Sequence, residues 1–176
     1  TNTVHVLGPG LEHVHPAFQA GRILTSSRAL NLIFVVDLDL ETVVWALRDG
    51  FKKQHDPRIV AGTHLLVFDN VGAKRGARVL EYDLATMRPV WTYRGTDNEP
   101  FLSKTLGTAH RLDNGNTLIT ESEGGRAFEV TREGEVVWEF FNPHRAGDSD
   151  EFIAALFEVT RLPRDFGESW RSVVQD

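Results

Sequence analysis

The sequence contains no cysteine and only one methionine among its 176 residues. The absence of cysteine excludes disulfide bonds, thiolate metal ligands and a cysteine nucleophile. No apolar run approaches the ~20 residues that a membrane-spanning helix needs, so we expect no membrane span in this chain. Lys and Arg form no dense cluster and the net charge is −6, which argues against a nucleic-acid partner.

Three five-residue segments, VVWAL, PVWTY and VVWEF, repeat along the chain. Their tryptophans are Trp45, Trp91 and Trp138, which lie 46 and 47 residues apart. Short runs of β-branched and aromatic residues precede each tryptophan and are separated by Gly, Asn and Asp, which is typical of strands and turns. A near-constant period of this size indicates a repeated structural unit.

Each repeat contains four candidate strands, and the first of them is expected at residues 13–19, 55–61 and 108–114. Four strands in about 46 residues are typical of a β-propeller blade. We therefore predict an all-β chain, a single partial β-propeller domain over residues 1–176 with three four-stranded blades. A β-sandwich is the alternative, but sandwiches rarely repeat side chains in register. The blades are expected at about residues 11–49, 53–95 and 106–142, with a terminal strand and tail at 150–165.

Three blades do not close a propeller, because closure needs about four to eight. An open arc would leave two apolar blade faces in water, which favours association. The missing blades are expected in the same precursor, in another chain, or in a second copy. The repeated tryptophans are interpreted as structural, each filling the wedge between neighbouring blades.

Several longer stretches carry a more specific pattern. The pattern Ser-x-Arg-x-x-Asn occurs in ILTSSRALNLIFVVD. The pattern His-Asp … Phe-Asp-Asn … Arg-x-x-Glu-Tyr occurs in QHDPRIVAGTHLLVFDN followed by GARVLEYD. A last blade is expected in RLDNGNTLITESEGGRAFEVTREGEVVWEFFNPHR. Together, from residue 2 to about 166, they resemble the arylsulfotransferase family of mostly bacterial, exported six-bladed propellers. The resemblance corresponds to the C-terminal half of such a propeller and implies a periplasmic or secreted location.

The resemblance implies transfer of a sulfuryl group from a phenolic sulfate ester to another phenol. A histidine carries the group between two half-reactions, and neither a nucleotide donor nor another cofactor is expected. A neutral imidazole is a competent nucleophile near neutral pH, and guanidinium groups stabilise the negative charge spread over the transferring group. The expected ligands are phenolic small molecules.

The resemblance also assigns residues to the site. His55 in QHDP matches a channel-lining histidine of the family, and Arg78 in GARVLEYD matches the arginine that follows it. With His110 in TAHRLDNG, they are the predicted catalytic residues. Arg28 in SSRALN and Asn70 in VFDN are the predicted substrate-binding residues.

Two features of the pattern weaken the prediction of catalysis. The family carries a His-x-Asn motif whose histidine would lie directly before Thr1, outside this sequence. Aligning the repeats on AGTH and DNGN places His110 opposite Arg58, so its register differs from that of His55. Arg78 also has Glu81 and Asp69 as nearby ion-pair partners.

Other hypotheses for the function of the chain therefore stay open. A non-catalytic propeller that serves as a scaffold or interaction subunit of a larger complex is the main alternative to the enzyme. Another propeller enzyme, or a sugar- or quinone-binding module, is a third, although no motif singles it out. His13 and His15 have a metal-ligand spacing, but no third ligand lies nearby in sequence, so no metal site is predicted.

Overall fold

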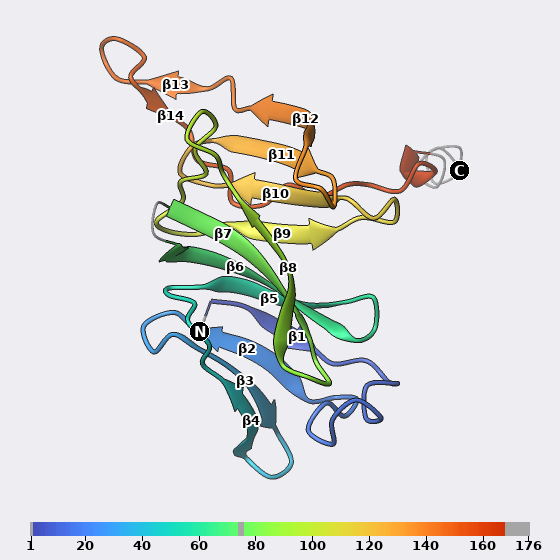
Figure 1. Cartoon of the computed structure of the whole chain (residues 1–176). Helices are drawn as coiled ribbons and strands as arrows, with labels where there is room; N and C mark the ends of the chain where they lie inside the picture. Colours follow the sequence, from blue (N-terminus) through green and yellow to red (C-terminus); the bar gives the residue numbers. More distant parts are fainter. Residues whose placement is uncertain (1, 74–75, 168–176) are drawn as a thin grey trace, which may run out of the picture.

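The computed structural model describes residues 2–73 and 76–167 and shows three four-stranded antiparallel sheets side by side (Figure 1). In each sheet the strands follow one another in sequence order, which confirms the predicted all-β fold of three blades. A small hairpin follows the third sheet. The strands are β1 (Val4–Val6), β2 (Ile23–Ser27), β3 (Leu32–Asp37) and β4 (Thr42–Leu47); β5 (His55–Val60), β6 (His64–Ala73), β7 (Gly76–Asp83) and β8 (Arg88–Arg94); β9 (Thr108–Arg111), β10 (Thr117–Glu121), β11 (Arg126–Val130) and β12 (Val136–Phe141); and the hairpin strands β13 (Arg145–Ala146) and β14 (Phe152–Ile153).

One of the expected strands is wrong, and another is shorter than its expected range. The first blade begins with β1 at Val4–Val6, whereas residues 13–19 form turns in which the Phe18 amide donates to the His15 carbonyl at 3.0 Å. Phe18 is completely buried in this turn. In the expected terminal strand at 150–165, only the two residues of β14 pair with a neighbour.

The three tryptophans hold one position in the three sheets. Each lies directly opposite a residue of the third strand, and a β-bulge follows that residue in every case. A bulge increases local twist, so its repetition at one place gives the sheets a common shape. The pairs are Trp45 with Val35, Trp91 with Glu81, and Trp138 with Glu129.

Two apolar cores lie between consecutive sheets. The first joins β2 and β3 to β6 and β7, and Trp45 packs against it. The second joins β6–β8 to β9–β11, and Trp91 packs against it. The predicted wedge role is thus confirmed for these two tryptophans, while Trp138 is 41% exposed. Fully burying a large apolar side chain stabilises the fold by about 1.5–3 kcal/mol, so these cores hold the three sheets together.

The two outer faces of the arc differ. On the first sheet, Val4, Val6 and Val43 are 64%, 69% and 51% exposed, so this face has no neighbouring blade in the structure. The third sheet is instead covered by residues 154–161, in which the Val159 amide donates to Thr120 Oγ1 at 3.0 Å. Leu118 of β10 is consequently only 2% exposed.

Candidate functional site

The start of β5 contains an irregularity in strand pairing that orients the side chains of His55 and Asp56. His55 pairs with Phe68 and Arg58 with Leu66, so the two residues between them oppose a single residue of β6. Asp56 takes a positive φ of 50°, a conformation that Asp tolerates better than most residues. As a result, both His55 and Asp56 are buried, at 8% and 4% exposure, and each enters a different polar network.

His55 is held by Asn70 of β6. Asn70 Nδ2 donates to the carbonyls of Ser103 and Leu106, at 2.8 and 2.6 Å, which fixes the orientation of the amide. Its Oδ1 therefore faces His55 and accepts a hydrogen bond from Nδ1 at 2.7 Å. Because Nδ1 carries the proton, the lone pair of the neutral ring lies on Nε2.

The environment keeps the His55 ring neutral. Burial lowers the pKa of His55, and the positive charge of Arg28 lowers it further, although the Asn70 hydrogen bond acts in the opposite direction. Arg28 is half-buried, and its guanidinium donates to the Lys104 carbonyl at 3.3 Å. The neutral imidazole of His55 is thus a potential nucleophile near neutral pH, and the guanidinium of Arg28 is the cation near it.

A second network surrounds Asp56 on the inner strands of the three sheets. Arg58 Nε donates to Asp56 Oδ2 at 2.8 Å, and Nε2 of His5 lies 3.5 Å from Asp56 Oδ1. Nε2 of His110 lies 3.8 Å from Asp56 Oδ2. Although burial raises the pKa of Asp56, its contacts with His5 and Arg58 outweigh this and keep the pKa below its usual value.

Three of these groups occupy equivalent positions. His5 pairs with Leu24, Arg58 with Leu66 and His110 with Leu118. On its other side, each leucine pairs with the third-strand residue that lies opposite the tryptophan of that sheet. The predicted alignment of His110 with Arg58 is therefore confirmed. One position per blade thus points a basic side chain towards the same carboxylate, because the inner strands of consecutive blades converge.

The segment that covers the third sheet adds a second carboxylate. Glu158 Oε1 lies 2.9 Å from Arg58 Nη2 and 3.0 Å from His110 Nε2. The His110 nitrogen is buried, yet it is not aligned for a hydrogen bond with any partner in the described part of the chain. Burial lowers the pKa of His110, and Arg58 lowers it further, despite the opposing effect of the two carboxylates.

Arg78 lies in a different network. Its Nε donates to Asp69 Oδ2 at 2.7 Å and its Nη2 to the Gly50 carbonyl at 3.0 Å. Asp69 is fully buried and also accepts hydrogen bonds from the amides of Lys52 and Gly72. This arrangement fastens the loop before β5 to the second sheet, and none of these contacts involves His55.

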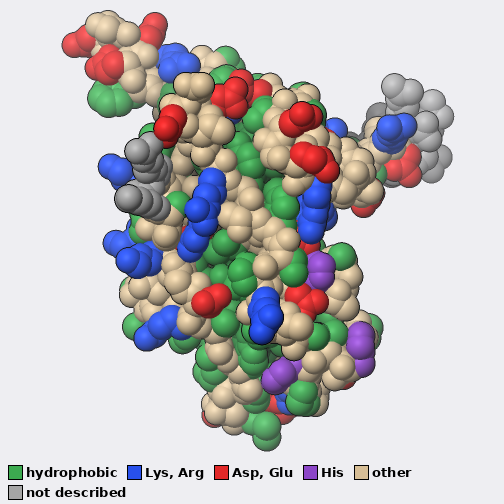
Figure 2. All heavy atoms as spheres, viewed as in Figure 1, with side chains coloured by type: hydrophobic (Ala, Val, Ile, Leu, Met, Phe, Trp, Pro, Cys, Tyr) green, Lys and Arg blue, Asp and Glu red, His purple; other side chains and the backbone are tan. Residues whose placement is uncertain are grey.

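Two of the cavities in the described part of the chain border the sheets. One, of about 410 Å³, is lined by His5, Arg58 and apolar residues of the loop after β1, including Leu7 and Leu11. Ligand pockets commonly measure about 300–1,000 Å³, so a small aromatic molecule fits a cavity of this size. Figure 2 shows histidines on the right flank of the lower half of the molecule, beside acidic side chains.

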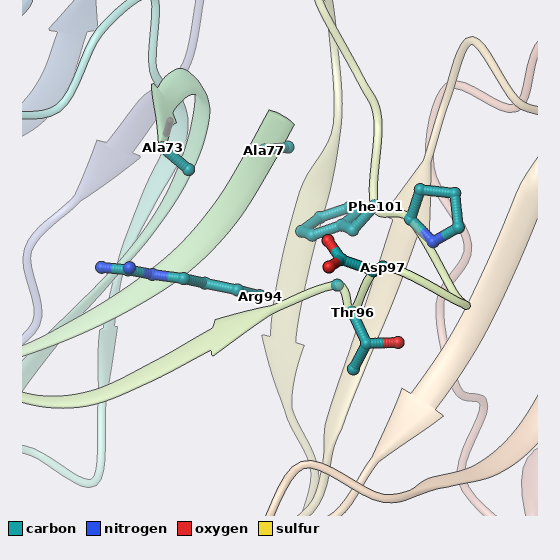
Figure 3. A pocket seen from close by; sticks show the side chains of 8 residues that line it. Ala73, Ala77, Arg94, Thr96, Asp97 and Phe101 are labelled. Carbon is teal, nitrogen blue, oxygen red and sulfur yellow. The ribbon is translucent and has the colours of Figure 1, made fainter. Parts of the chain in front are cut away.

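The other cavity, of about 390 Å³, lies between the ends of β7 and β8. In Figure 3 the Asp97 carboxylate lies beside the Phe101 ring, whereas the Arg94 side chain points away from both. Its described lining includes no histidine and none of the predicted site residues. The polar networks around His55 and Asp56 therefore form the candidate site.

The predicted residues divide among these networks. His55, Asn70 and Arg28 come together, His110 lies in the adjacent Asp56 network, and Arg78 lies apart from both. Sequence reasoning missed His5 and Glu158, because neither belongs to a recognisable motif. The position shared by the inner strands would have indicated His5, but the long segment 7–22 between β1 and β2 hides the repeat spacing there.

Within residues 2–73 and 76–167, no three His, Asp or Glu side chains are grouped as metal ligands. The same described residues include no helix with the length and apolar character needed to cross a bilayer.

Comparison with solved structures supports the fold. The WD40 β-propeller domain of Doa1 superposes with a TM-score of 0.55 and 16% identity, covering 80% of this chain and 40% of that chain. BamB from Moraxella catarrhalis matches with a TM-score of 0.45 and 18% identity, over 74% of this chain and 38% of that chain. The chain therefore spans well under half the length of these two proteins.

Comparison at the level of sequence gives one result. No curated protein matches the chain. Residues 1–143 match the family model described as arylsulfotransferase (ASST), which covers most of the chain.

Proposed function

The chain belongs to the arylsulfotransferase (ASST) family, and we propose that it forms part of an enzyme that transfers a sulfuryl group between phenols. The donor is a phenolic sulfate ester and the acceptor is another phenol. The observation that carries the proposal is the hydrogen bond from His55 Nδ1 to Asn70 Oδ1, at 2.7 Å. It leaves Nε2 of a neutral, buried imidazole as the nucleophile.

In the first half-reaction, Nε2 of His55 attacks the sulfur of the ester. The N–S bond forms as the bond from sulfur to the aryl oxygen breaks, and the donor leaves as a phenolate. In the second half-reaction, the oxygen of the acceptor phenol attacks the same sulfur, the N–S bond breaks with its electron pair returning to Nε2 of His55, and the phenolic proton passes to solvent. The sulfur keeps its oxidation state, so no oxidant takes part, and the phenolic ester supplies the sulfuryl group in place of a nucleotide.

The cations near His55 and Asp56 have complementary roles. Arg28 supports the neutral state of His55 through its charge, and its half-buried guanidinium can contact the sulfuryl oxygens. Asn70 orients the imidazole, and its side chain already makes three hydrogen bonds within the chain. The position of Arg78 on the buried Asp69 supports a structural role, so its predicted catalytic role stays a prediction.

The complete active site requires blades that this chain does not contain. The exposed apolar face of the first sheet, with Val4 and Val6, supports packing of a preceding blade there. The missing half belongs to the same precursor, another chain or a second copy. The periplasmic or secreted location implied by the family resemblance is part of this proposal.

The transfer is tested on the full-length protein with 4-nitrophenyl sulfate as donor and a second phenol as acceptor. Release of 4-nitrophenol should depend on the acceptor and should disappear in His55→Asn. His13→Asn is the matched control, because His13 lies exposed in the turn before β2. Equal activity in both variants would refute the assignment of His55.

A second function, a non-catalytic scaffold, is favoured by one observation. The exposed face of the first sheet offers an apolar surface, with Val4 and Val6, for association whether or not the inner site is active. Native mass spectrometry of the purified protein separates the cases. A completed propeller without any acceptor-dependent transfer supports the scaffold, whereas a completed propeller with transfer supports the enzyme.

A further inference from the structure

Residues 154–161 occupy a distinctive place in the arc. In the first two sheets, the face that carries the tryptophan is covered by the next sheet. On the third sheet the same face is covered by this segment, which in Figure 1 continues from β14 along the third sheet towards the C-terminus. The Leu156 amide donates to the Ser122 carbonyl at 3.1 Å, and Arg161 Nη2 donates to Glu129 Oε2 at 2.6 Å.

Glu158 is the residue of this segment that reaches the inner strands. Its carboxylate lies between Arg58 Nη2 and His110 Nε2, at 2.9 and 3.0 Å. Arg58 uses its Nε for Asp56, so its Nη2 is the donor directed at the second anion. The position thus offers a guanidinium and an imidazole, from consecutive blades, to one acceptor oxygen.

A sulfate-ester oxygen has the same requirements as this carboxylate oxygen. Guanidinium groups bind both anions with charge-assisted hydrogen bonds, and imidazole supplies a further donor when it is protonated at the facing nitrogen. The cavity of about 410 Å³ lined by His5 and Arg58 lies next to the position, and its apolar walls suit an aromatic ring. A ligand with an aryl group and a sulfate group therefore matches the cavity and the cationic pair together.

We propose that Glu158 is an intramolecular competitor that fills an anion position between Arg58 and His110, and that the sulfate group of a ligand enters by displacing it. The ligand class, an aryl sulfate, rests on the proposed function. The competition itself rests on the geometry of Glu158, Arg58 and His110.

Displacement of Glu158 requires little reorganisation. Its side chain is 46% exposed, against 30% for Arg58 and 12% for His110, so the mobile partner is the one in contact with water. Residues 154–161 form no strand, and an ion pair with an exposed partner contributes only about 0–1 kcal/mol. The segment can stay attached through Arg161 and Leu156 while the Glu158 side chain turns away.

The test measures binding in the absence of an acceptor. The full-length protein is titrated calorimetrically with inorganic sulfate, with 4-nitrophenyl sulfate and with neutral 4-nitrophenol. Glu158→Gln keeps the size of the side chain and removes its charge. Glu133→Gln, on the exposed turn between β11 and β12, is the matched control for the change in net charge.

Glu158→Gln should bind both sulfates about two- to fivefold more tightly than the wild type, with no change for 4-nitrophenol. Glu133→Gln should bind them as the wild type does. The proposal is overturned if Glu158→Gln binds the sulfates no more tightly, if both variants gain equally, or if no sulfate binds. Tighter sulfate binding by Glu158→Gln without transfer activity would refute the proposed enzyme and support the competition by Glu158. Transfer activity with unchanged sulfate binding would support the enzyme and refute the competition.

Discussion

Arg58 and His110 hold the same position in consecutive blades, and both reach Asp56, at 2.8 and 3.8 Å. Each lies on an inner strand opposite a leucine of the second strand, Leu66 in one blade and Leu118 in the next. A repeat normally reuses one side chain for packing, as the tryptophans do here. At this position of the inner strands the repeat instead places basic side chains around the Asp56 carboxylate. The position is therefore suited to binding anions.

The first prediction concerns the pH dependence of stability. The pKa of His55 is lower in the folded protein than the value of about 6.5 in the unfolded chain, mainly because the ring is buried. The unfolded state therefore binds more protons below that pH, so the free energy of unfolding should fall as the pH drops from about 7.5 to about 5.5. His55→Asn should show a smaller fall in urea unfolding than His13→Asn, and equal falls would contradict the burial of a neutral His55.

The second prediction concerns Asn70. Asn70→Asp places a carboxylate opposite Nδ1 of His55, and an opposite charge at 2.7 Å favours the protonated imidazole. The pKa of His55, followed by NMR of its Cε1 proton, should rise, and the transfer rate near neutral pH should fall because less neutral imidazole remains. Asn98→Asp, in an exposed loop, serves as control. An unchanged His55 titration in Asn70→Asp would show that the two side chains do not interact.

The third prediction separates structure from catalysis at Arg78. Arg78→Met leaves the fully buried Asp69 carboxylate without its cation, which should lower the free energy of unfolding by about 3–5 kcal/mol. Arg88→Met, at an exposed end of β8, should change it little. At a temperature where Arg78→Met is still folded, KM and kcat should stay close to wild type. A folded variant that has lost kcat would instead restore the catalytic role expected from the sequence.

The fourth prediction compares two repeated tryptophans. Trp91 packs into the core between the second and third sheets and donates through Nε1 to the Arg132 carbonyl at 2.7 Å, so Trp91→Ala should cost about 3–5 kcal/mol. Trp138 is 41% exposed and faces Arg161, at 5.9 Å from the ring, so Trp138→Ala should cost about 1–2 kcal/mol. Denaturant unfolding measures both, and equal losses would mean that Trp138 is covered in the intact protein.

Much of the fold was predictable because the repeat is local. Turn residues and strand residues recur with each tryptophan, and the second and third blades follow from that pattern. The first strand was not predictable, since Val4–Val6 is short and two of its three side chains lie on an exposed face. The segment 13–19 was expected as a strand from its place before the next candidate strand, but it forms turns that bury Ala17 and Phe18.

The site was only partly predictable. The family resemblance indicated His55, Asn70 and Arg28, which the structure brings together. The sequence offered both Asp69 and Glu81 as partners of Arg78, and the choice of Asp69 depends on which strand residues pair in β6 and β7. Glu158 was beyond sequence reasoning, since its position depends on how residues 154–161 cross the third sheet.

The central claim is that His55 carries the sulfuryl group, and the most direct measurement is the mass of the protein during turnover. The full-length protein is mixed rapidly with 4-nitrophenyl sulfate without acceptor, quenched, digested and mapped by mass spectrometry. We expect an added sulfuryl group on the peptide that contains His55. This group should disappear when a phenol acceptor is supplied. An adduct on another residue, such as His110, or release of 4-nitrophenol without any adduct, would contradict the central claim.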